Sequence, residues 1–425
     1  MLKIFFPILS SSMIPSKLSY LTLSTNLMLV NWSISNSNMH SISYFLMGDL
    51  LSFWMTNLTL WMILTISFLK INSKKYSMIS NMILMIMFLT FYNWNIMMFY
   101  IMFEISLMMI IIYILMWSYQ PERLESTLYM LIMTSIFSLP FMYLIIMELS
   151  NTNFWFNSLK LNMWKFMSMV FIFSMKMPIY FLHMWLPKAH TEAPIQGSMI
   201  LAALMLKLGS YGLTRISMIL SKEKTFSISL IMLLMLMTIL LSMNCIIQTD
   251  LKMLIAYSSI VHMMMSFICI ILNKNLAINS MLIMSISHGL TSSMMFFMAN
   301  MVYLKSKSRN LIINKGIMNN SNSDKIIWFT ACMMNLPMPP FLGILSEIFS
   351  MKLILDWYPM MITMVIIMMM FSFMFSLFIF IQISQTNKSK IINMGNLKTL
   401  KKNLITNLHW MPNLMIIKLS MIMLS

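Results

Sequence analysis

Residues 173–185 read FSMKMPIYFLHMW, and this short stretch decides how the chain folds. It lies inside a long apolar run, yet it places Lys176 two residues before Pro178. Proline lacks a backbone N–H and clashes with the preceding helical turn, so a helix is expected to break directly after the lysine. The stretch therefore predicts an interrupted helix that carries a charge in apolar surroundings.

The composition of the whole chain is that of a membrane protein. Of its 425 residues, 60% are hydrophobic and only 9% are charged, whereas a soluble domain has about 25% charged residues. Apolar runs fall at 2–15, 18–33, 50–70, 77–93, 95–117, 125–149, 163–186, 194–220, 226–247, 252–272, 276–304, 325–351, 357–383 and 404–424. One membrane crossing takes about 20 such residues as a helix, whereas a barrel strand takes about ten alternating ones. We expect an all-α polytopic bundle of about 14 transmembrane helices, with strands unfavoured.

The basic residues test this count independently. From the third run on, every second connection holds 15 lysines and arginines in total, whereas the intervening connections hold 6. By the positive-inside rule, the lysine-rich side is the one from which the chain was inserted, the matrix in a mitochondrion. The net charge of +17 is spread through these connections rather than gathered in one patch, so it indicates topology and not nucleic-acid binding.

The high methionine content is the most unusual feature of the composition, with 61 methionines beside 8 glycines. This bias indicates an AT-rich gene read with an extra methionine codon, as in animal mitochondria. Metal binding by thioethers is the alternative, but the methionines are spread over every apolar run. Three separated cysteines, without a CxxC, GxGxxG or P-loop pattern, predict no metal, cluster or nucleotide cofactor in this chain.

Five ionisable residues fall well inside predicted spans: Glu104, Lys176, Lys207, His288 and Glu347. A charge at the bilayer centre costs about 2.5–3.5 kcal/mol on insertion scales, so such groups mark ion paths, relays or counter-ions. A row of them can transfer protons, with Glu104 tuning the protonation of Lys176. Structural roles stay open: a helix-to-helix tie for the first two, a packing role for Lys207, and a hydrogen-bonded core histidine at 288.

Several other ionisable residues lie nearer the ends of the predicted spans. His183 and His262 are possible relays, and packing is an equally open reading for each. The acidic side chains near span ends are expected to be mostly solvated: Glu122, Glu125, Glu148, Glu192 and Asp250.

A second proline-rich stretch, NLPMPPFLGILSE at 335–347, predicts another broken helix just before Glu347. Broken membrane helices at corresponding places in two halves point to inverted repeats around a transport path. We therefore expect five-helix repeats at 77–220 and 221–384, preceded by helices 1–3 in 1–76 and followed by a loop and last helix in 385–425. MLKIFFPILSS at the start is expected to be the first membrane segment.

Six collinear blocks carry a family resemblance. They are FYIMFEISLMMI around Glu104, QPERLESTLYML from Gln120, KMPIYFLHMWLPKAHTEAPIQGSMILAALMLKLGSYG from Lys176, QTDLKMLIAYSSIVHM from Gln248, HGLTSSMMFFMAN from His288, and LPMPPFLGILSE ending at Glu347. The sequence resembles the chain 4 family of mitochondrial NADH:ubiquinone oxidoreductase, respiratory complex I, which is related to Mrp-type cation/proton antiporter subunits. The terminal acid differs from the lysine of some relatives but is the form expected of chain 4.

The resemblance implies discontinuous helices 7 and 12, a Glu104–Lys176 pair, a central Lys207, and a charged axis continued by His288 and Glu347. It also implies proton translocation in the inner mitochondrial membrane, coupled to reduction of ubiquinone elsewhere in the complex. NADH, FMN, iron–sulfur clusters and ubiquinone would be held by other subunits. The implied partners are the antiporter-like chains 2 and 5 and lipids such as cardiolipin.

Two other functions remain open from the residues. A free-standing Na⁺/H⁺ antiporter would need a cation site and sodium-dependent proton flux. A purely structural membrane subunit would keep the inherited charges, and pumping would then survive neutralisation of Glu104 and Lys176 together.

Overall fold

The computed structural model describes residues 40–43, 46–69, 74–93, 95–118, 120–149, 163–219, 228–272, 274–384 and 399–422. Within them the elements of regular secondary structure are helices, apart from one short antiparallel hairpin, β1 (His40–Ser43) paired with β2 (Leu46–Gly48). This hairpin lies between the predicted apolar runs 18–33 and 50–70, so the expectation of helices in the runs is unaffected. The two strands have four and three residues, too few to span a membrane, and their pairing satisfies backbone groups of each.

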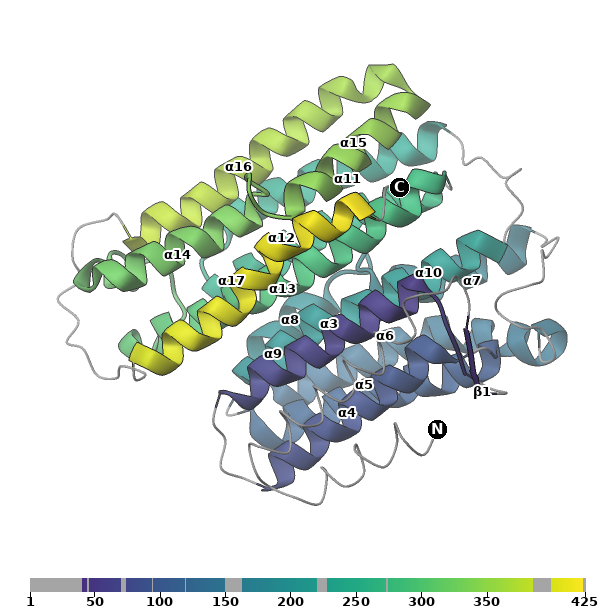
Figure 1. Ribbon diagram of the computed structural model, residues 1–425, viewed down its shortest axis with the longest axis horizontal. Helices are drawn as coiled ribbons and strands as arrows, with labels where there is room; N and C mark the ends of the chain where they lie inside the picture. Colours follow the sequence, from purple (N-terminus) through teal and green to yellow (C-terminus); the bar gives the residue numbers. More distant parts are fainter. Residues whose placement is uncertain are drawn as a thin grey trace.

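The first half of the described helices runs from α3 to α10 (Figure 1). Their bounds are α3 (Leu50–Ser67), α4 (Lys74–Tyr92), α5 (Ile96–Trp117), α6 (Arg123–Leu144), α7 (Met163–Lys176), α8 (Trp185–Glu192), α9 (Ile195–Ile200) and α10 (Leu206–Ile219). Single π-helical turns, η1 (Ile145–Leu149) and η2 (Leu201–Met205), continue α6 and join α9 to α10. Helix α9, the π turn η2 and helix α10 thus form one continuous helical rod, the α9–α10 rod.

The second half runs from α11 to α17. Its elements are α11 (Ile228–Ile247), α12 (Leu251–Ile271), α13 (Asn275–Ser306), η3 (Ile317–Asn320), α14 (Asn322–Asn335), α15 (Gly343–Trp357), η4 (Pro359–Met361), α16 (Ile362–Ser384) and α17 (Thr399–Ile422). Every predicted apolar run from residue 50 onward contains helix, which confirms the all-α prediction. The first two runs, 2–15 and 18–33, lie outside the described residues.

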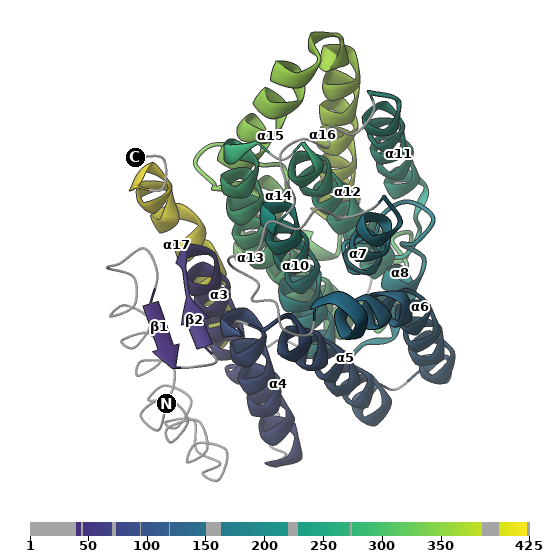
Figure 2. The ribbon, with the colours of Figure 1, turned by 90° about the vertical axis from the view of Figure 1, so that its right-hand side faces the viewer.

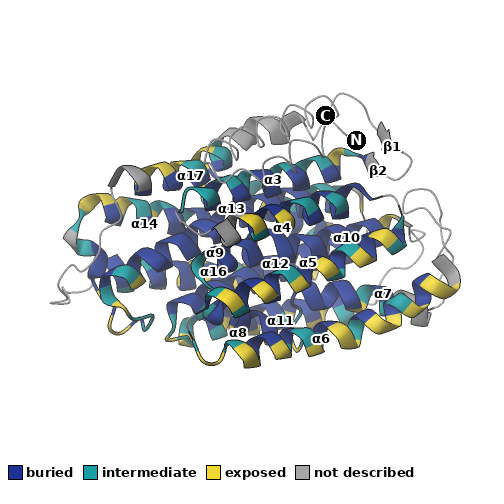
Figure 3. Cartoon of the chain, turned by 90° about the horizontal axis from the view of Figure 1, so that it is seen from below, coloured by how far each residue is buried: buried dark blue, intermediate teal, exposed yellow. Residues whose placement is uncertain are grey.

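Burial separates inner helices from outer ones (Figure 3). The most apolar windows of α13 and of the α9–α10 rod are fully buried, whereas that of α6 is 33% buried and that of α16 is 39% buried. The outward face of α6 repeats every three or four residues: Leu124, Leu128, Ile132, Ile136, Leu139 and Tyr143 are all exposed. Such an apolar stripe on a helix of spanning length fits lipid or a neighbouring membrane subunit. The chain is a multi-pass membrane protein.

Two helices are broken where the sequence predicts breaks. The first ends at Lys176 and resumes as α8 at Trp185, and the second ends at Asn335 and resumes as α15 at Gly343. Phe181, inside the first break, has a left-handed backbone conformation with φ of 73°. The division into two inverted repeats, at 77–220 and 221–384, stays a prediction.

The last described helix, α17, returns to the first half of the molecule. It packs against α13 and also contacts α3, so segments far apart in the sequence lie side by side (Figures 1 and 2). The indole N–H of Trp61 on α3 donates to the backbone carbonyl of Leu408 on α17 at 2.7 Å. This hydrogen bond ties α17 to α3.

Candidate functional site

Lys207 lies in the fully buried rod, two residues after the end of the π-helical segment η2. Its ammonium Nζ donates to the backbone carbonyl of Ala202 at 2.7 Å. A π turn alters the register of the helical hydrogen bonds, and such turns are frequent at functional sites. Because the Lys207 side chain is 1% exposed, this carbonyl takes the place of water around the charge.

His288 on α13 supplies the second partner of Lys207. The lysine Nζ lies 2.8 Å from His288 Nδ1. A lysine ammonium has only donors, so in that state Nδ1 accepts and the ring proton sits on Nε2. Gly289, the next residue, lets α3 pack closely against α13, since a Cβ there would lie 2.8 Å from a methyl carbon of Leu58 on α3.

His262 and Glu347 extend the same polar group across two further helices. The Nδ1 atom of His262 on α12 lies 3.2 Å from Oε1 of Glu347 on α15. The imidazole rings of His262 and His288 have centroids 6.0 Å apart. The structure therefore brings four predicted residues, Lys207, His288, His262 and Glu347, into one buried series.

A small cavity lies at the break between α14 and α15. It has about 10 Å³ of water-accessible space, close to what a single water molecule needs. Its lining includes His262, His288 and Glu347 together with Asn335 at the end of α14. His262 Nε2, Glu347 Oε2 and Asn335 Nδ2 are buried and have no protein partner among the described residues. These three atoms give a water molecule enough polar partners, so the break supplies a place for one.

Glu104 and Lys176 form a second polar group with a different geometry. They interact electrostatically, but among the described residues they form no ion pair within 4.0 Å. The lysine Nζ instead donates to the backbone carbonyl of Phe103 at 3.3 Å and lies 3.1 Å from the centroid of that ring. The resemblance implies a Glu104–Lys176 pair, and the structure holds its members apart.

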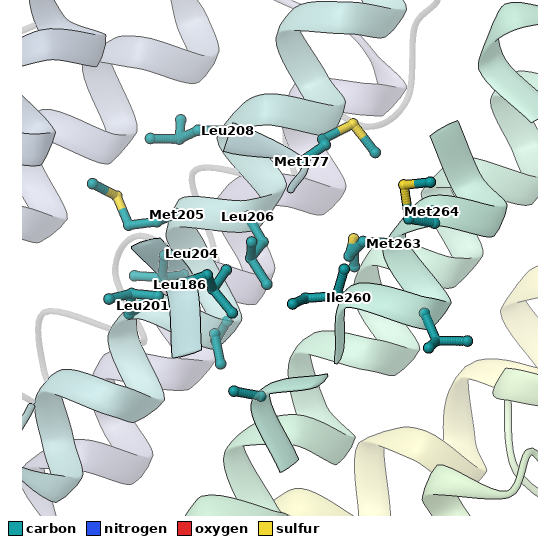
Figure 4. Packing of buried hydrophobic residues seen from close by; sticks show 14 of the residues in the cluster. Met177, Leu186, Leu201, Leu204, Met205, Leu206, Leu208, Ile260, Met263 and Met264 are labelled. Atoms are coloured by element: carbon teal, nitrogen blue, oxygen red, sulfur yellow. The ribbon is translucent and has the colours of Figure 1, made fainter. Parts of the chain in front are cut away.

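Apolar packing surrounds the two lysines of these groups. Met177 follows Lys176 directly, and Leu206 and Leu208 flank Lys207; all three side chains are fully buried in the main core (Figure 4). No hydrogen bond or ion pair joins Lys176 to Lys207 within the described ranges. The helices themselves are in close contact, because a Cβ at Gly209 on α10 would lie 3.1 Å from the Cβ of Lys176.

His183 lies in the first break and is buried without joining either group. Its ring packs at 5.3 Å from Tyr180 and 5.8 Å from Tyr257, measured between centroids. Its Nδ1 has no hydrogen-bond partner in the described part of the chain. This geometry supports packing more than a relay.

Two residues expected in loops are buried instead. Glu192, at the end of α8, is 8% exposed and its Oε2 has no partner in the described part of the chain. Lys252, counted among the loop lysines, donates to the backbone carbonyl of Ala193 at 2.8 Å. The breaks draw the chain inward here, so hydropathy alone misplaces both. The solvated reading holds for Glu125, which pairs at 3.4 Å with exposed Lys188.

His190 is a buried histidine that sequence reasoning did not place in the site. It is stacked on Phe296 of α13, with ring centroids 4.6 Å apart and planes 7° apart. Neither ring nitrogen has a hydrogen-bond partner among the described residues, and the ring lies within electrostatic range of Lys207 and Lys252. Its position in the KAHTEAP stretch after the break was the available signal.

Comparisons with known proteins agree with this geometry. Residues 93–374 match the family model of NADH:quinone oxidoreductase/Mrp antiporter membrane subunits. NADH-ubiquinone oxidoreductase chain 4 of Apis mellifera ligustica is 35% identical over 415 residues, which cover 93% of this chain and 91% of the relative.

Two solved structures share the fold at low sequence identity. A chain of respiratory complex I from Thermus thermophilus with bound NADH is 15% identical and superposes with a TM-score of 0.84, covering 97% of this chain and 94% of that one. A chain of the Mrp complex from Dietzia sp. DQ12-45-1b is 17% identical with a TM-score of 0.80, covering 97% and 50%. The chain belongs to the family of NADH-ubiquinone oxidoreductase chain 4, within the wider family of NADH:quinone oxidoreductase and Mrp antiporter membrane subunits.

Proposed function

We propose that this chain moves protons across the inner mitochondrial membrane as a subunit of respiratory complex I, driven by NADH oxidation and ubiquinone reduction in other subunits. The observation that carries the proposal is the buried series of Lys207, His288, His262 and Glu347. The contact distances are 2.8 Å between Lys207 Nζ and His288 Nδ1 and 3.2 Å between His262 Nδ1 and Glu347 Oε1. Proton transfer needs donors and acceptors at such distances or one water apart.

The transfer steps follow from the partners of each atom. Lys207 Nζ passes a proton to His288 Nδ1, which leaves a neutral amine held by the Ala202 carbonyl and an imidazolium on α13. The imidazolium releases its Nε2 proton toward the cavity, where one water spans the 6.0 Å between ring centroids. His262 takes that proton and hands it to Glu347. Glu347 is the terminal carboxylate from which the proton leaves.

Glu104 and Lys176 act as the switch in this proposal. A charged Lys176 that moves from the Phe103 carbonyl to Glu104 gains an ion pair, and one that moves back loses it. Each position favours a different protonation state of the lysine. The apolar packing around Met177 keeps the pair from exchanging protons freely with Lys207. Glu104 is therefore the modulating counter-ion, and Lys176 is the protonatable group that it controls.

The exposed surface of the chain indicates where partners would bind. The exposed apolar faces of α6, α11 and α16 are where we place lipids, cardiolipin among them, and the antiporter-like chains 2 and 5. We assign no cofactor to this chain. NADH, FMN, iron–sulfur clusters and ubiquinone stay with the partner subunits, so this chain contributes proton transfer and no electron transfer.

The test is Lys207→Met in the assembled complex, because methionine keeps the length of the side chain and removes its protons. Loss of a general acid and base lowers a rate by about 10²–10⁴-fold, so coupled pumping should fall by at least tenfold. Lys352→Met is the matched control, since Lys352 is exposed on α15. Normal turnover with an unchanged number of protons per electron in assembled Lys207→Met enzyme would refute the proposal.

A further inference from the structure

The last helix carries a buried polar row that the proton path above does not use. Lys402, Thr406, His409 and Asn413 are spaced by four, three and four residues, which places them on one face of α17. Each is at most 4% exposed. Helix α17 packs against α13 and α3 (Figures 1 and 2), so this face is enclosed by protein at membrane depth.

A proline interrupts α17 beside this row. Pro412 has no backbone N–H, so it leaves the carbonyl of Leu408, four residues earlier, without its helical donor. The indole of Trp61 fills that position at 2.7 Å. Lys176 and Asn335 each precede a proline by two residues, and His409 precedes Pro412 by three. The polar row on α17 thus lies beside a proline, as do the breaks between α7 and α8 and between α14 and α15.

The hydrogen bonding of His409 fixes which nitrogen is free. Its Nδ1 lies 2.8 Å from the carbonyl of Ile405. A carbonyl can only accept, so Nδ1 carries the proton and Nε2 of the neutral ring is an acceptor. Nε2 is buried without a partner in the described part of the chain, and so are Oδ1 and Nδ2 of Asn413. Both side chains are 0% exposed.

Three orphaned polar atoms on one helix face call for a ligand. Residues four apart on a helix have Cβ atoms about 5–6 Å apart, a gap that one water molecule can bridge. A water there donates to His409 Nε2 and accepts from Asn413 Nδ2. We propose that α17 holds a buried water site between His409 and Asn413, and that this water completes the hydrogen bonding of the seam between α17, α13 and α3.

The site has a polar connection toward one face of the membrane. Lys402 at the start of the row contacts Asp324 on α14, and Asp324 also accepts from Lys305 on α13 at 2.6 Å. Both lysines belong to the side that is richer in basic residues. Thr406 lies between this cluster and His409, and its hydroxyl already donates to Asn403 of the same helix. Buried polar side chains therefore follow one face of α17 from its lysine-rich start to its middle.

The direct test is a cryo-EM map of the assembled complex at a resolution that shows ordered water. We expect a density peak within hydrogen-bond distance of both His409 Nε2 and the Asn413 amide, and its loss in Asn413→Leu. Thr406→Val is the matched control and should keep the peak, since that hydroxyl is bonded within its own helix. A direct His409–Asn413 hydrogen bond with no water, or a lipid chain in the seam, would overturn the proposal.

A second measurement separates this site from the proton path. His409→Leu and Asn413→Leu each leave one polar partner unsatisfied, whereas the double variant removes both partners. The loss of stability in the double variant should therefore be smaller than the sum of the losses in the two single variants. The readout is the yield and thermal midpoint of the assembled complex. Strictly additive losses would contradict a shared water. Because the readout is stability and not pumping, a negative result here would leave the proposed proton path unaffected. Failure of the proton path would likewise leave the water site unaffected.

Discussion

The two polar groups of this membrane bundle differ in continuity. Lys207, His288, His262 and Glu347 follow one another through short contacts and one cavity. In the other group, Lys176 is bonded to the Phe103 carbonyl instead of to Glu104. A continuous series can conduct, whereas a lysine with two alternative partners can switch. This difference is the basis of our proposal that the first group conducts protons and the second controls their passage.

Glu347→Gln is expected to have the largest effect among the variants that test this assignment. Glutamine keeps the size of the side chain and its contact with His262, but it cannot take up a proton. Removing a general acid and base costs about 10²–10⁴-fold, so we expect coupled pumping at least tenfold lower. Proton uptake by reconstituted complex checks this. Near-normal pumping with Glu347→Gln would break the continuous series at its last member.

Gly209→Ala tests whether the two groups depend on close helix packing. The new Cβ would lie 2.9 Å from Met177 Cγ and 3.1 Å from the backbone nitrogen of Met177, so the break between α7 and α8 must shift. Overpacking of this kind costs about 1–3 kcal/mol. We expect a severalfold loss of assembled complex, measured by native gel, with Ser210→Ala as the neighbouring control. Full assembly and full pumping would mean that the position of Lys176 is unimportant.

Glu104→Gln should have a smaller effect on pumping than Glu347→Gln. In the proposed mechanism the carboxylate acts on Lys176 electrostatically and is not a member of the conducting series. We expect pumping to fall severalfold, with assembly intact, and the pH dependence of turnover to change because the counter-ion is gone. A loss as large as that of Glu347→Gln would place Glu104 in the series itself and remove the distinction.

His183→Phe is expected to have the smallest effect. Phenylalanine keeps the ring that packs between Tyr180 and Tyr257, and it removes both nitrogens. Pumping should stay within about twofold of the parent, since replacement by a ring of similar volume costs little. A tenfold loss of pumping in fully assembled enzyme would make His183 a relay after all.

Much of this fold follows from the sequence because hydrocarbon restricts the choice of structure. Apolar runs must be helices, charges must find partners, and Pro178 and Pro337 must break their helices. The contact between His262 and Glu347 does not follow, because it depends on how far α12 and α15 are rotated toward each other. The π turn before Lys207, the burial of Glu192 and the orphaned ring of His190 share that dependence on packing. Hydropathy predicts which residues lie within the membrane, but it does not predict how each helix is rotated about its own axis.

The central claim is tested most directly by the number of protons moved per electron in assembled His288→Leu enzyme. Leucine fills the space with no proton to exchange, and it cuts the series between Lys207 and His262. We predict fewer protons per electron, or little turnover of any kind, while Lys352→Met behaves as the parent. Parent-like turnover with an unchanged proton-to-electron ratio in His288→Leu would contradict conduction through this series.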